Sequence, residues 1–217
     1  MIFFKNFTLY HGSKVLLENY SGHFSKNKFI GITGANGSGK TSLLRALSGL
    51  NTNYKGTLSI NSKNLTDYSL KELSCLRTYV PAAPICHWSL SVQQLLSIEN
   101  PFFETKKEIL DDLNLCPLLS QNFKTLSSGE KARVFLAHAL MRETDILILD
   151  EITSHLDDHY QNLVMQHLQH LAQKGKSIFL SIHQKNLAFS YCDHVLCLES
   201  QSLEPLTKSK SFLKEIQ

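Results

Sequence analysis

Short apolar runs separated by turn residues dominate the first sixty residues of the chain. Glycine, serine and asparagine mark the turns, as at His11-Gly12-Ser13, and apolar runs bounded in this way are typical of strands. The expected elements are strands at residues 2–10, 14–24, 28–33 and near 57–60, and a helix from residue 40 to about residue 50.

The last third of the chain alternates strand and helix patterns. The expected strands are residues 146–150, 177–182 and 194–198, and the expected helices are residues 158–173 and 185–191. Alternating strands and helices predict a parallel sheet that is covered on both faces. Residues 82–142 are less regular, contain several helical patterns and follow a proline at position 81. We interpret this region as an inserted helical lobe.

Composition and charge narrow the class of protein. The 217 residues are 42% hydrophobic, enough for a sizeable core, and the net charge of +3 is too small to indicate a nucleic-acid-binding surface. The longest apolar runs, such as Ile146–Leu149, fall far short of the roughly 20 residues of a spanning helix. The N-terminus has no signal-peptide pattern, so the cytosol is expected. Five irregularly spaced cysteines without a C-x-x-C pair argue against a disulfide framework or a zinc site.

A glycine-rich loop follows the strand at residues 28–33 and opens the first helix. Residues 34–41 match G-x-x-x-x-G-K-[ST], a pattern whose glycines let backbone N–H groups converge on phosphates. Lys40 would bridge the β- and γ-phosphates of ATP, and the Thr41 hydroxyl would bind Mg²⁺. The expected nucleotide-binding residues here are Gly34, Ala35, Asn36, Gly37, Ser38, Gly39, Lys40, Thr41 and Ser42.

Two acids and a histidine follow neighbouring strand patterns. Asp150 and Glu151 come after the apolar run Ile146–Leu149, and ligands of open α/β sheets lie beyond the carboxyl ends of the strands. Asp150 is suited to hold Mg²⁺ through its water shell, and Glu151 to take a proton from the attacking water. His183 ends the next strand and would contact the γ-phosphate. Without the phosphate loop, the acids would be interpreted as solvated turn residues and the histidine as structural.

A third motif identifies the family. Leu126-Ser127-Ser128-Gly129-Glu130 precedes a helical run from Lys131 to Met141, and Ser127 with Glu130 also fits a capping box. The segment resembles the L-S-G-G-Q signature of ABC ATPases, and the resemblance extends from Tyr10 to about Leu198. Tyr10 matches the aromatic residue that stacks on adenine, Ser154–Asp157 resembles the D-loop, and His183 the switch histidine.

The resemblance implies a fold, a cofactor and partners. The fold class is α/β: a P-loop NTPase core whose parallel sheet is flanked by helices, with an N-terminal antiparallel β subdomain and an inserted α-helical subdomain. Residues 1–81 and 143–217 would form the core and 82–142 the helical signature subdomain of one domain. ATP and Mg²⁺ would bind between two subunits, and the signature residues Ser127, Ser128, Gly129 and Glu130 would contact the nucleotide of the other subunit.

The implied assembly is a homodimer, or a heterodimer with a related cassette, on an integral membrane permease. If the transporter is an importer, a periplasmic or extracellular binding protein would deliver its cargo. No nucleic acid is expected as a partner. The chain would be peripheral, on the cytoplasmic face of the inner (plasma) membrane.

Several residues depart from the family pattern. Ser128 replaces the usual glycine, Glu130 the usual glutamine and Ile152 the usual proline; these changes are mild. Ala82 is more serious, because it stands where most relatives carry the Q-loop glutamine that touches Mg²⁺ and the attacking water.

The sequence argues against three alternative functions. A soluble, non-transport ABC ATPase usually carries two cassettes or a long insertion. A small-molecule kinase has no use for Leu126–Glu130, and a degenerate binder would not keep Lys40 and Glu151.

Residues 68–81 and 183–193 resemble cassettes of iron-chelate, haem and vitamin B12 importers. The pair His183-Gln184 is also similar to the haem exporter of cytochrome c maturation, which remains the alternative cargo hypothesis.

Overall fold

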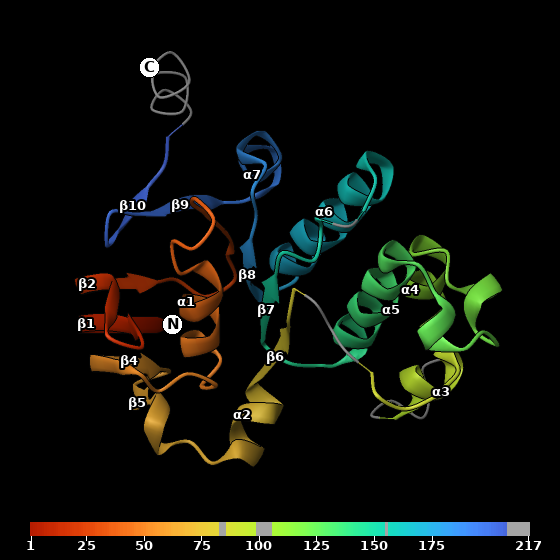
Figure 1. The fold of residues 1–217 in the computed structure, drawn as a ribbon, viewed down its shortest axis with the longest axis horizontal. Coiled ribbons are helices and arrows are strands. Elements are labelled where there is room, and N and C mark those ends of the chain that lie inside the picture. The colour runs from red at the N-terminus through yellow and green to blue at the C-terminus, as the bar shows by residue number, and fades with distance from the viewer. Residues whose placement is uncertain (83–85, 99–105, 155, 208–217) are drawn as a thin grey trace.

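The computed structural model describes residues 1–82, 86–98, 106–154 and 156–207. These residues form two sheets with flanking helices and a separate helical lobe (Figure 1). Within these ranges, no helix is long and apolar enough to cross a membrane.

The N-terminal sheet has four antiparallel strands in the order β2-β1-β4-β5. They are β1 Ile2–His11, β2 Lys14–Phe24, β4 Tyr54–Ile60 and β5 Lys63–Asn64. Both long strands predicted from the sequence are present, and Gly12 makes the tight turn between them with a φ of 59°. Ile2, Phe4, Phe7 and Leu9 are buried and turn one face of β1 toward the core.

The larger sheet has six strands in the order β10-β9-β3-β8-β7-β6. They are β3 Phe29–Thr33, β6 Arg77–Val80, β7 Ile146–Asp150, β8 Ser177–Ser181, β9 His194–Glu199 and β10 Ser202–Pro205. All neighbouring pairs are parallel except β9 and β10. The sequence did not predict β10, which returns antiparallel through Ser200 and Gln201, both at positive φ as a two-residue hairpin requires.

The parallel sheet is buried on both faces, as predicted. Alternating residues of β7 divide between two cores: Ile146 and Ile148 join one, Leu147 and Leu149 the other. The first core packs the sheet against α1 (Lys40–Leu47) and the antiparallel sheet. The second packs it against α6 (Asp158–Gln173) and α7 (Lys185–Tyr191). One face is therefore covered partly by a second sheet rather than by helices alone.

Side-chain capping bonds start several of the helices. In α6, which has the predicted limits, the Asp157 carboxylate accepts a hydrogen bond from the Tyr160 N–H at 2.9 Å. A capping box between Ser69 and Glu72 starts α2 (Leu70–Leu76), a helix that the sequence analysis did not predict.

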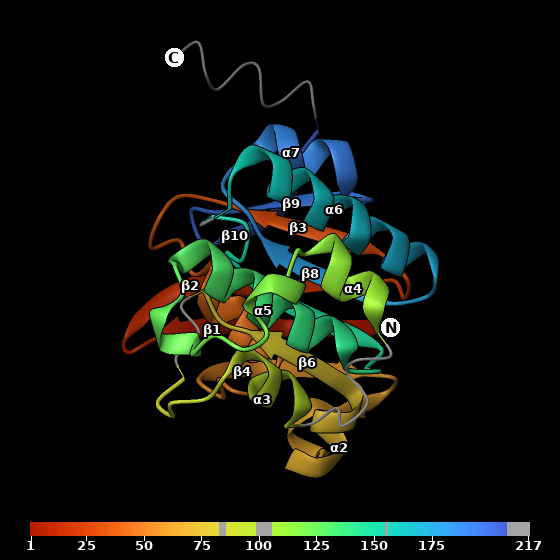
Figure 2. The ribbon, with the colours of Figure 1, turned by 90° about the vertical axis from the view of Figure 1, so that its right-hand side faces the viewer.

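The helical lobe contains α3 (Val92–Ser97), α4 (Lys107–Asp112) and α5 (Ser128–Met141). Figure 2 views the molecule from the side of this lobe, with α5 in front of the sheet. The lobe packs on α6: the Arg133 guanidinium lies 4.2 Å from the centre of the Tyr160 ring and donates to the Leu113 carbonyl at 2.8 Å. Helices α3, α4 and α5 lie within residues 82–142, the range predicted as an inserted lobe. The bounds of the lobe stay a prediction, and residues 83–85 and 99–105 fall outside the described residues.

The two sheets are joined by aromatic packing, which gives a stability prediction. Phe179 of β8 is fully buried and its ring centre lies 5.4 Å from that of Phe24 in β2. We expect Phe179→Ala to lower the free energy of unfolding by about 3–5 kcal/mol, because it removes a buried aromatic ring and leaves a cavity. Urea unfolding followed by circular dichroism measures this. Phe3→Ala is the control, since Phe3 is 40% exposed, and equal losses in the two variants would contradict the prediction.

Candidate functional site

One row of paired residues fixes the position of the site. Ile32 of β3 is opposite Ser181 of β8, and Ser181 is opposite Asp150 of β7. These three parallel strands therefore end at the same edge of the sheet. The glycine-rich loop and Glu151 follow directly from the ends of β3 and β7, and His183 follows β8 after one intervening residue, Ile182.

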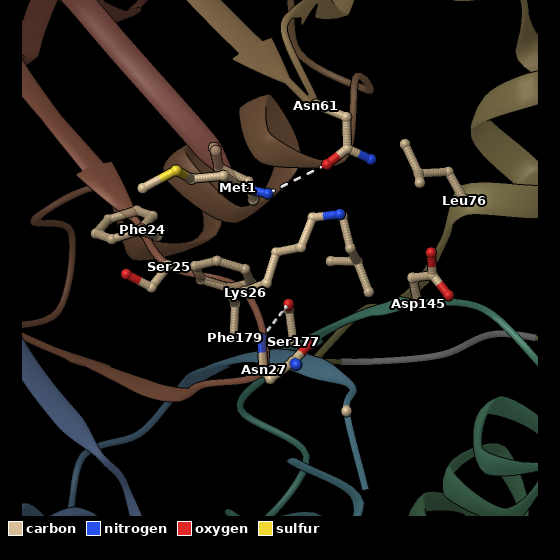
Figure 3. Close-up of a pocket in the computed structure, with 13 residues that line it drawn as sticks. Met1, Phe24, Ser25, Lys26, Asn27, Asn61, Leu76, Asp145, Ser177 and Phe179 are labelled. Atoms are coloured by element: carbon tan, nitrogen blue, oxygen red, sulfur yellow. Dashed lines mark hydrogen bonds between the residues drawn. The ribbon is translucent and has the colours of Figure 1, made fainter. Parts of the chain in front are cut away.

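A different cavity lies at the opposite edge, where the strands begin. It has a volume of about 140 Å³ and is lined by residues that include Lys26, Asp145 and Ser177 (Figure 3). Since Ser177 and Ile146 open β8 and β7, this cavity is separated from the predicted site by the length of the strands. None of the predicted site residues lines it.

The glycine-rich loop connects β3 to α1, as predicted. Gly34 has a φ of 149°, and a Cβ there would lie 2.4 Å from the carbonyl oxygen of Leu198. Gly39 has a φ of 109°, and a Cβ there would lie 3.0 Å from the Leu16 side chain. Both positions require glycine for close packing and for a backbone conformation that other residues rarely adopt. Ala35, Asn36 and Gly37, at the tip of the loop, are exposed.

Lys40 is the first residue of α1, and its side chain is only 4% exposed. Its Nζ donates hydrogen bonds to the carbonyl oxygens of Gly34 at 3.0 Å and Ala35 at 3.1 Å. The same Nζ lies 3.8 Å from Glu151 Oε1. A buried ammonium is costly unless it is paired and hydrogen-bonded, and these contacts satisfy that requirement. They hold the positive charge across the base of the loop.

Asp150 is 1% exposed and is held by two hydroxyl groups. Ser181 Oγ donates to Asp150 Oδ1 at 2.6 Å, and the Tyr79 hydroxyl lies 3.5 Å from Oδ2. Burial, followed by the negative charge of Asp150, raises the pKa of Tyr79 to about 12. The phenol therefore stays protonated and able to donate. The sequence analysis identified neither Ser181 nor Tyr79, because their contribution depends on the pairing of the strands.

Glu151 contacts one residue from each of the other two predicted motifs, Lys40 of the glycine-rich loop and His183. Its Oε1 lies 2.8 Å from His183 Nε2 and within ion-pair distance of Lys40. Its backbone has a φ of 49°, a conformation that is uncommon for residues other than glycine, and its N–H donates to Ser181 Oγ at 2.8 Å. His183 does not end β8 as predicted: the strand ends at Ser181, and Ile182 separates the histidine from it. His183 nevertheless reaches the same sheet edge.

The residues present fit a magnesium nucleotide. The buried Ser38 hydroxyl has no hydrogen-bond partner within the described part of the chain, so the loop keeps an unused polar atom. Thr41 is exposed at the start of α1, with Ser42 beside it. A hydroxyl and a carboxylate are the hard oxygen ligands that Mg²⁺ prefers. The donor set of Thr41 and Asp150 therefore agrees with the predicted metal site.

One predicted nucleotide contact, Tyr10, lies in the antiparallel sheet. Tyr10 is in β1, paired with Val15, one residue from the Leu16 side chain that packs on Gly39. Lys55 Nζ lies 5.8 Å from the centre of the Tyr10 ring. Tyr10 is thus in the sheet that borders the loop, but its contact with adenine stays a prediction.

The signature residues lie in the helical lobe, at the start of α5. The predicted capping box is confirmed: Ser127 Oγ accepts from the Glu130 N–H at 3.3 Å, and Glu130 Oε2 accepts from the Ser127 N–H at 2.8 Å. The Ser127 hydroxyl also donates to Glu130 Oε2 at 2.7 Å, and this bond, followed by the one from the Ser127 N–H, lowers the pKa of Glu130. Ser127 and Ser128 are exposed, with Gly129 partly so. Among the described residues, no hydrogen bond or ion pair joins them to the phosphate loop of the same chain, which lies outside the lobe (Figure 1).

The segment after Glu151 is also folded tightly. Ser154 Oγ donates to the Glu151 carbonyl at 2.7 Å, and Asp157 caps α6. His155, which belongs to the predicted D-loop, lies outside the described residues. Ala82 is partly buried after β6 and has only a methyl group to offer at the Q-loop position.

The fold and the site define a nucleotide-binding protein of the P-loop class. Comparison with known proteins then gives the family: the model for the ABC transporter matches residues 17–154. The chain belongs to the ABC transporter family, as an ATP-binding cassette.

Named relatives and solved structures agree with this assignment. The hemin import ATP-binding protein HmuV of Pseudoalteromonas translucida is 30% identical over 207 residues, which cover 87% of this chain and 79% of the relative. The vitamin B12 import ATP-binding protein BtuD of Vibrio atlanticus is 31% identical over 189 residues, covering 80% and 75%. The chain spans half the length of another relative, the uncharacterized ABC transporter ATP-binding protein YvrA of Bacillus subtilis, with 29% identity over 219 residues.

The fold is shared with solved cassettes. An ATP-binding subunit of an ABC transporter superimposes with a TM-score of 0.84 at 22% identity, covering 99% of this chain and 93% of that one. A dimeric bacterial ABC transporter cassette gives a TM-score of 0.78 at 24% identity, covering 94% and 97%.

The position of Lys40 gives a binding prediction. We expect Lys40→Ala to weaken ATP binding by roughly 10- to 150-fold, because hydrogen bonds to charged groups contribute about 1.5–3 kcal/mol. Isothermal titration calorimetry measures the change. Lys28→Ala, just before β3 and 41% exposed, is the matched control and should bind ATP normally. An unchanged affinity of the Lys40 variant would refute the assignment.

Proposed function

We propose that this chain hydrolyses magnesium ATP and drives transport through an integral membrane permease. The observation that carries the proposal is the convergence of Lys40, Asp150, Glu151 and His183 at one sheet edge. Membership of the ABC transporter family supports it.

The described geometry suggests a role for each group. The glycine-rich loop and Lys40 bind the β- and γ-phosphates, because a helix N-terminus and a buried ammonium both favour anions. Thr41 and Asp150 would hold Mg²⁺, which neutralises charge on the phosphate oxygens when bound. Glu151 accepts a proton from the attacking water, and His183 orients the Glu151 carboxylate through the 2.8 Å contact and faces the γ-phosphate. Tyr10 stacks on the adenine.

A second subunit completes the site. The start of α5, where Ser127 and Ser128 are exposed, lies in the helical lobe rather than beside the phosphate loop of the same chain (Figure 1). In a head-to-tail homodimer, or a heterodimer with a related cassette, this helix start contacts the γ-phosphate held by the other subunit. The similarity in fold to a dimeric cassette is consistent with this arrangement.

The names of the relatives favour import as the direction of transport. Two of them are named for the import of hemin and of vitamin B12. We therefore favour a metal-chelate cargo such as haem, delivered by a periplasmic or extracellular binding protein to the permease. The chain would be peripheral at the cytoplasmic face of the inner membrane. Co-purification with a multi-spanning protein would support a transporter, whereas its consistent absence favours a soluble ABC ATPase.

Replacement of the proposed base separates binding from hydrolysis. Glu151→Gln should bind ATP with near-normal affinity and lose hydrolysis by about 10²- to 10⁴-fold, because an amide of the same shape cannot accept the proton. Calorimetry and phosphate release measure the two properties. Glu143→Gln, at an exposed carboxylate, is the control. Hydrolysis by the Glu151 variant at the parental rate would show that another group is the base.

Mixed dimers test whether the signature acts across the interface. Combining Lys40→Ala chains with Ser127→Arg chains yields heterodimers with one doubly damaged site and one intact site. We expect part of the ATPase activity to return, and differently tagged chains allow the heterodimers to be purified. Activity that stays at the level of the single variants in purified heterodimers would count against composite sites.

A further inference from the structure

We propose that Ser181 is a positioning residue of the hydrolytic site, one hydroxyl that orients both the magnesium-binding Asp150 and the base Glu151. The proposal rests on the proposed function. The strand before the histidine was predicted only as a buried strand, and nothing in the family motifs described above includes Ser181.

The Ser181 hydroxyl donates one hydrogen bond and accepts another. Ser181 Oγ donates to Asp150 Oδ1 at 2.6 Å and accepts from the Glu151 N–H at 2.8 Å. A hydroxyl has one proton and two lone pairs, so donating to the carboxylate leaves a lone pair for the N–H group. Both contacts are short, and Ser181 is completely buried. Water therefore does not compete for either of them.

The surrounding strands leave the hydroxyl little freedom. Ser181 is paired with Ile32 on one side and with Asp150 on the other, at the last positions where the three strands are aligned. Its Cα is thus held by two neighbouring strands. The contact between Asp150 Oδ2 and the Tyr79 hydroxyl is longer, at 3.5 Å. Ser181 is therefore the tighter of the two restraints on the carboxylate.

The second bond supports an unusual backbone. Glu151 has a φ of 49°, a strained conformation that persists only where the surroundings enforce it. The N–H bond to Ser181 and the bonds from Ser154 to the Glu151 carbonyl enforce it here. That conformation aims the Glu151 side chain toward His183 and Lys40. One hydroxyl thus fixes the relative placement of the metal-binding acid and the base.

The test compares Ser181→Ala with Ser181→Thr and with a matched control on the same strand. Ser177→Ala removes a hydroxyl at the far end of β8, where it accepts the Asn27 N–H at 3.1 Å. Binding of a non-hydrolysable ATP analogue is measured by calorimetry with and without Mg²⁺, and steady-state ATPase kinetics give kcat and KM.

Ser181→Ala should bind the analogue normally without Mg²⁺ but lose about 10-fold or more of the affinity gained with Mg²⁺. Groups that orient metal ligands typically contribute factors of 10 to 100. Its kcat should fall by a similar factor with little change in KM. Ser181→Thr should recover much of both, and Ser177→Ala should match the parent.

Two outcomes would overturn the proposal. The first is a folded Ser181→Ala protein with a parental magnesium effect and parental kcat; the second is equal losses in Ser181→Ala and Ser177→Ala. Should the alanine variant not fold, Ser181→Cys replaces it, since a thiol is only a weak donor, and full function of that variant would be equally decisive. If the parent itself shows neither magnesium-dependent binding nor hydrolysis, the proposed function fails instead.

Discussion

The alignment of three parallel strand ends is the constraint on which the site depends. Ile32, Ser181 and Asp150 lie side by side across β3, β8 and β7. Because side chains alternate between the two faces of a sheet, a shift of one residue in the pairing of β7 with β8 would turn Asp150 toward the other core. The same pairing is stabilised by apolar residues on both faces. The hydrophobic packing of the sheet and the geometry of the site are therefore set together.

The charges at this edge are arranged around one buried cation. The Lys40 ammonium is enclosed by two loop carbonyls and approached by Glu151, which also contacts His183. Carbonyl oxygens satisfy its hydrogen bonds without neutralising its charge, so the loop keeps a positive potential where phosphates would bind. Glu151 Oε1 lies 3.8 Å from the same ammonium, so the acid proposed as the base is also an ion-pair partner of the loop lysine.

Much of this arrangement was predictable from the sequence. The rest was not, because it depends on strand pairing or gives only a weak local signal. The glycine-rich loop, Asp150 and Glu151 carry local patterns, and the helical pattern of residues 158–173 predicts α6. The antiparallel strand β10 is short and follows a two-residue turn, which gives a weak signal. Ser181 looked like one more residue of an apolar strand, since its two hydrogen bonds depend on pairing with β7, thirty-one residues away. Its contribution could not be seen without the register.

The chain after Glu151 links the chemistry to the helical lobe. The turn between Glu151 and α6 is held by Gln161, which is 7% exposed and donates from Nε2 to the carbonyls of Thr153 and Leu156. One residue earlier, Tyr160 stacks under Arg133 and its hydroxyl accepts from Asn114, both in the lobe that carries the signature. On the other side of the lobe, Ala82 has only a methyl group. These contacts of α6 with the lobe therefore lie directly downstream of the proposed base.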